Sequence, residues 1–177
     1  MLISVIVGLG LSHLLTSAAR LIQRRRRIRL YPPTLLWMGT LFIVQIQIWW
    51  VSFHMRTELE WDFFSFLFSL AIPVIGYLLC YLVVPALDGD MVDLRTSYHE
   101  NRVWFFGLAA AAFVVSFGSD LMANGIPLDM NTAFRVVFIL LALVAILVRR
   151  EWYHVFNAIT GLVLFCVYVF AEFLQLR

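Results

Sequence analysis

Lysine is absent from this chain, which has 13 arginines. Schiff-base chemistry with retinal or pyridoxal phosphate needs a lysine amine, so both cofactor classes are excluded. Genomes rich in G and C favour arginine codons, which indicates a bacterial source.

Cysteine and catalytic motifs are also scarce. The two cysteines, Cys80 and Cys166, lie in separate apolar runs and form no C-x-x-C pair. This placement favours small packing residues over redox chemistry. The chain contains no Walker A motif, G-x-S-x-G, H-E-x-x-H or TVGYG-like filter. With no nucleophile–base set visible, the sequence predicts a protein that is not an enzyme and that has no cofactor or metal site.

Apolar residues are in large excess. Hydrophobic residues make up 63% of the chain, and the mean hydropathy is +0.91, whereas a soluble domain is about half apolar. They fall into six runs near the length of about 20 residues that crosses a bilayer. The predicted helices are 2–22, 33–55, 63–87, 103–122, 131–148 and 152–174. The sequence therefore predicts an all-α, polytopic transmembrane bundle of six helices, with 1–177 as a single transmembrane domain.

Two of these predicted helices have special features. Pro73 lies inside the third and should kink it. The uncharged stretch of the fifth, 136–148, has only 13 residues, which is near the length of a re-entrant or interfacial piece. A crossing is favoured if Arg135 extends its long side chain to the interface. The region 88–102 is expected to be the longest loop.

The arginines predict the orientation. The first, third and fifth connections hold ten of the 13 arginines, and the opposite side holds three. Arginine-rich connections stay in the cytoplasm, so both termini should lie outside the cytoplasm. The protein itself is expected in the bacterial inner membrane. The largest group, Arg24, Arg25, Arg26, Arg27 and Arg29, is first a topology signal and is also expected to contact anionic membrane lipid. This run is short and tied to the membrane, so a nucleic-acid partner is not expected.

Polar residues inside apolar helices are costly and therefore informative. His13 lies near the middle of the first helix, on one face with Ser17. It could serve as a proton-relay or ligand-binding residue, or as a neutral imidazole bonded to a neighbouring helix. Gln45, Gln47 and His54 belong to the second helix. Glutamine often holds helices together, and a pore lining that includes Gln47 and His54 is the alternative.

Two acids, Asp120 and Glu172, come late in helices that run toward the predicted outer face. If they converge with His54 and the acids of the outer loop, they form an acidic vestibule for cations or a carboxylate–histidine metal site. Pairing of either acid with Arg56 or Arg135 is another interpretation, and solvated charge is the simplest one for the loop acids.

Three stretches carry a resemblance to a known family. They are Val7 to Ser12 (VGLGLS), Gln45 to Trp50 (QIQIWW), and Asp93 to Arg95 followed by Arg102 to Gly107 (RVWFFG). On these stretches the chain resembles an uncharacterised family of small bacterial six-helix inner-membrane proteins. The resemblance covers the whole length and implies no activity.

Three classes of function remain open. The first is permeation or transport of a small solute or ion, using His13, Gln47 and the outer acids. The second is an accessory or sensory subunit that acts through a partner membrane protein. A membrane enzyme comes last. Small residues such as Gly8, Ser12 and Gly107 offer close helix contacts, either within one chain or in a homo-oligomer.

Overall fold

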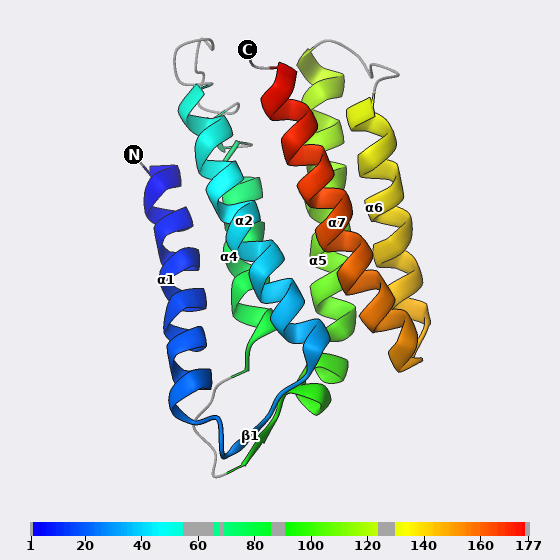
Figure 1. Ribbon diagram of the computed structural model, residues 1–177. Coiled ribbons are helices and arrows are strands. Elements are labelled where there is room, and N and C mark those ends of the chain that lie inside the picture. The colour runs from blue at the N-terminus through cyan, green and yellow to red at the C-terminus, as the bar shows by residue number, and fades with distance from the viewer. Residues whose placement is uncertain (1, 55–65, 68, 86–90, 124–129, 176–177) are drawn as a thin grey trace.

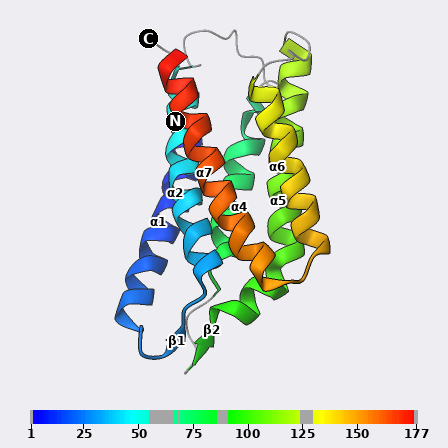
Figure 2. The ribbon, with the colours of Figure 1, turned by 45° about the vertical axis from the view of Figure 1, so that its right-hand side comes forward.

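A computed structural model describes residues 2–54, 66–67, 69–85, 91–123 and 130–175. Its helices are α1 (Leu2–Gln23), α2 (Pro32–His54), α4 (Ala71–Val83), α5 (Leu94–Ala123), α6 (Met130–Leu147) and α7 (Glu151–Gln175). They run side by side, alternately up and down, in one bundle (Figures 1 and 2). The all-helical prediction is confirmed. Four of the described helices, α1, α2, α5 and α7, are long and apolar enough to cross a membrane.

The first two helices and the last two lie where the sequence predicts them. Where an observed helix end differs from the predicted one, the difference is one residue. Arginine and proline residues at the helix ends explain the agreement. The arginine run ends α1, and the prolines at 32 and 33 occupy the first turn of α2, where a missing backbone N–H leaves no bond unmade.

The predicted loop 88–102 is wrong over most of its described part, because α5 begins at Leu94. The Asp93 carboxylate accepts a hydrogen bond from the backbone N–H of Arg95 at 2.9 Å, which satisfies one of the free donors of the first turn. The next turns are amphipathic, since Leu94, Tyr98 and Arg102 are all buried and share one helical face.

The third predicted helix also needs correction. Residues 66, 67 and 69 are helical, but a turn at Leu70 separates them from α4, which begins at Ala71 and has 13 residues, so Pro73 lies in the first turn of α4. Proline is tolerated at a helix start because its missing N–H would have no partner there. The residues Pro73, Gly76 and Cys80 are buried in the bundle.

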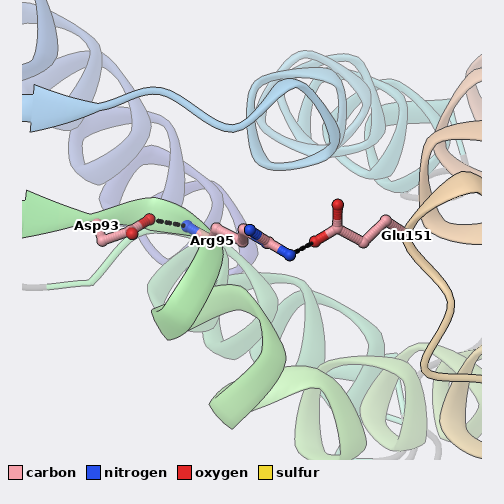
Figure 3. A network of polar contacts seen from close by, with 3 residues as sticks. All are labelled: Asp93, Arg95 and Glu151. Atoms are coloured by element: carbon pink, nitrogen blue, oxygen red, sulfur yellow. Dashed lines mark hydrogen bonds and ion pairs between the residues drawn. The ribbon is translucent and has the colours of Figure 1, made fainter.

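Two short strands tie the connections together at one end of the bundle. β1 (Ile28–Arg29) and β2 (Val92–Asp93) pair in parallel, with Ile28 beside Val92. The side chain of Arg95 then forms an ion pair with Glu151 at the start of α7 (Figure 3). The first, third and fifth connections therefore lie at the same end of the bundle (Figure 1). We call this end the arginine end and define it by Arg24 to Arg27, β1, β2, Arg149 and Arg150.

Candidate functional site

The residues that the sequence singled out do not form one site in the described structure. His13 stacks on Tyr81 of α4, with ring centroids 4.3 Å apart, and its buried Nε2 has no protein partner. Gln47 is half-buried on α2. His54, Asp120 and Glu172 occupy the final turns of α2, α5 and α7, far from the arginine end, and their side chains lie outside the described residues.

Gln45 occupies a close helix crossing. It is fully buried, and its Nε2 donates to the Cys80 sulfur at 3.2 Å. A Cβ placed on Gly10 would lie 2.5 Å from this Nε2, and one on Gly76 would lie 3.3 Å from it. Gln45 thus fills the space where α1, α2 and α4 meet, which is the helix-joining role expected of a membrane glutamine.

A different group of polar side chains gathers between α2, α5 and α7 near the arginine end. This polar cluster consists of Tyr31, Thr34, Tyr98, Arg102, His154 and Asn157, with exposed fractions between 0% and 7%. In α5 and α7 the two members lie four and three residues apart, so each pair lies on one helical face, while Tyr31 directly precedes α2 and Thr34 lies in its first turn. The Tyr31 and His154 rings both lie 5.3 Å from the ring of Tyr98.

Hydrogen bonds fix the proton on His154. Its Nε2 lies 3.0 Å from the carbonyl oxygen of Val148, and a carbonyl only accepts, so Nε2 carries the proton. In the neutral tautomer Nδ1 accepts from the Tyr98 hydroxyl, 3.2 Å away. The imidazole is held from both sides, with the His99 ring 5.2 Å away.

Arg102 is the only charged member of the polar cluster. Its exposed fraction is 6%, and its Nη1 makes a long hydrogen bond of 3.5 Å to the carbonyl of Val148. Its Nε has no protein partner, and no carboxylate among the described residues pairs with it. An uncompensated buried charge is strongly unfavourable, so it indicates a site for an opposite charge.

The other unpaired atoms of the polar cluster can all donate. The Tyr31 hydroxyl, the Thr34 hydroxyl and the Asn157 amide nitrogen have no protein partner. Burial raises the pKa of Tyr31, and the Glu151 carboxylate raises this pKa further, so the phenol stays protonated near neutral pH. Unpaired donors and a guanidinium are groups that bind a carboxylate, phosphate or halide. They do not fit a cation.

An aromatic layer closes the polar cluster on the side toward the middle of the bundle. Trp37, Phe105 and Phe106 form it, with the Trp37 ring 5.5 Å and 5.7 Å from the other two. A Cβ on Gly161 would lie 2.9 Å from the Trp37 ring, so α2 and α7 touch through this indole.

Sequence reasoning missed the polar cluster for two reasons. Tyr98 lay in a predicted loop, and His154 lay at a predicted helix end, where polar residues are normally solvated. The available signal was spacing: Tyr98 with Arg102, and His154 with Asn157, are polar pairs on one helical face beside apolar neighbours. Among the residues with described side chains, no group of three or more histidine, cysteine or acidic residues could hold a metal ion.

Comparison with known proteins adds no relative: no protein-family model, curated protein or solved structure matches the chain.

Proposed function

We propose that this chain is a six-span protein of the bacterial inner membrane that binds a small anionic solute at the polar cluster and lets it cross. The observation that carries the proposal is Arg102, a buried guanidinium with an unpaired Nε. Intramembrane ionisable residues of this kind usually mark a substrate or ion path. The surrounding donors of Tyr31, Thr34 and Asn157 select an acceptor-rich solute.

The proposed topology makes α4 and α6 crossing helices as well. The 18 residues of α6 rise about 27 Å, close to the thickness of the hydrocarbon core, and α6 packs beside α5 and α7 (Figure 2). The arginine end then faces the cytoplasm, and both termini lie outside. A solute from the cytoplasm would meet the polar cluster first.

Each part of the site has a distinct role in this account. Arg102 supplies the charge, and the donors of the polar cluster replace the water shell of the solute. The Tyr98–His154 pair holds α5 against α7. Trp37 acts as the gate, in one chain or in a homo-oligomer. No covalent step is involved, so the protein is not an enzyme.

A second candidate is a sensory or accessory subunit that binds the same anion without passing it. The aromatic layer favours this alternative, because Trp37 fits tightly against Gly161. Under this account the bound anion would shift α7 relative to α2, and a partner membrane protein would read the shift. Binding is common to both candidates, and only flux separates them.

The first test is thermal unfolding of the purified full chain with added acetate, phosphate or chloride at constant ionic strength. An anion at ten times its Kd should stabilise the wild type by about 1.4 kcal/mol. Arg102→Gln should abolish this effect. Arg95→Gln is the matched control, because Arg95 lies on the same helix but is exposed. Equal stabilisation of wild type and Arg102→Gln would overturn the proposed site.

A further inference from the structure

An apolar groove separates α1 from α2 on the surface of the bundle. Its volume is about 530 Å³, and its walls include Leu14 and Ile22 of α1 and Met38 and Phe42 of α2. Gly39 lies in the wall, and a Cβ added there would meet no atom within 4 Å. The groove is therefore open because this position has no side chain.

The groove has the length of one bilayer leaflet. From Leu14 to the last residue of α1, Gln23, a helix rises about 14 Å. Half of the hydrocarbon core is about 15 Å thick. A lipid tail lying between these helices would therefore run from the headgroup region to about the middle of the bilayer.

Positive charge lies at the headgroup end of the groove. Arg25 is part of the groove lining, is exposed, and donates only a 3.3 Å hydrogen bond to the Ile22 carbonyl. Gln23 and Arg24 to Arg27 line a second hollow, of about 350 Å³, at the same place. Among the described residues no carboxylate lines either space, so the surface is complementary to an anion joined to an apolar chain.

We propose that this groove holds one acyl chain of an anionic phospholipid, with the lipid phosphate against Arg25. The proposal is independent of the solute site, because α1 contributes no residue to the polar cluster. A second copy of the chain is a less suitable occupant. A helix from another protomer would bring apolar side chains against exposed arginines at this end, whereas a phosphate is attracted to them.

Native mass spectrometry of the detergent-solubilised full chain tests this, with phosphatidylglycerol and phosphatidylcholine of identical chains as probes. Wild type should retain one phosphatidylglycerol in preference to phosphatidylcholine. Arg25→Gln should reduce this preference about fivefold, since one charge near the surface contributes about 1 kcal/mol. Gly39→Leu should reduce retention of both lipids by filling the groove, and Gly39→Ala should do so partially.

Two matched controls make the result specific. Gly8→Leu adds the same side chain at an exposed glycine on α1 that also has open space around it. Arg150→Gln removes an exposed arginine at the same end of the bundle. Both should behave as wild type. Equal retention of the two lipids by wild type would overturn the proposal, as would equal behaviour of Gly39→Leu and Gly8→Leu. Loss of a dimer in Gly39→Leu without a change in lipid retention would also overturn it.

Discussion

Arg102 and His154 approach the same backbone oxygen, the carbonyl of Val148 directly after α6, at 3.5 Å and 3.0 Å. This carbonyl holds α5 and α7 at the point where α6 ends. The imidazole has the shorter bond, and the guanidinium is poorly paired because its bond to this oxygen is long and its Nε has no protein partner. Arg102 is therefore retained at a cost in stability that its own hydrogen bond does not offset.

Replacing Arg102 with glutamine should make the anion-free protein more stable. The change removes a buried charge that lacks a counter-ion, and His154 still satisfies the Val148 carbonyl. We expect the free energy of unfolding to rise by about 1 kcal/mol or more. Thermal or denaturant unfolding in detergent, in a buffer of bulky zwitterions, measures it. A clear loss of stability would show that Arg102 is a structural residue.

Gly161→Ala should loosen the aromatic layer. The new methyl would come within 2.9 Å of the Trp37 ring, and a ring packed against Phe105 and Phe106 cannot move without a cost of about 1–3 kcal/mol. In vesicles the variant should pass anions faster than the wild type while binding them with similar affinity. If flux falls in parallel with stability, Trp37 is packing and not a gate.

The helix crossing at Gln45 predicts a pair of opposite glycine effects. Gly10→Ala should destabilise the protein by about 1–2 kcal/mol, because the methyl displaces Gln45 and its bond to Cys80. Gly8→Ala, which meets open space, should be neutral or slightly stabilising. In a Gln45→Ala background the cost of Gly10→Ala should largely disappear, and a double-mutant cycle measures this coupling. Additive effects would contradict the assigned contact.

Neutral replacement of Arg24 to Arg27 should disturb insertion more than folded stability. These residues are exposed, so they contribute little packing, but they dominate the charge asymmetry that orients the chain. Reporter fusions at Arg177 should place the C-terminus outside in the wild type and in a mixed orientation in the variant. A cytoplasmic C-terminus in the wild type would reverse the proposed orientation or remove one crossing.

Hydropathy and helix-ending residues were sufficient to predict α1, α2, α6 and α7, because one end of each adjoins prolines or an arginine group. The first turns of α5 could not be predicted in this way. Tyr98 and Arg102 lower the local hydropathy, and contacts with Tyr31, Val148 and His154 from other elements help to bury them. The polar cluster shares this cause, since burial at helix ends depends on neighbouring helices. Gln45 shows the converse case, in which the predicted structural role of a membrane glutamine matches its packing.

Anion flux through reconstituted vesicles tests the central claim most directly. The vesicles would be loaded with the anion that most stabilises the purified protein, and efflux would be followed after dilution. Wild type and Arg95→Gln should release it well above the rate of protein-free vesicles. Arg102→Gln should be slower by roughly tenfold or more, because a hydrogen bond to a charged group contributes about 1.5–3 kcal/mol. Efflux from wild-type vesicles no faster than from protein-free ones, or equal for wild type and Arg102→Gln, would contradict anion passage through the polar cluster.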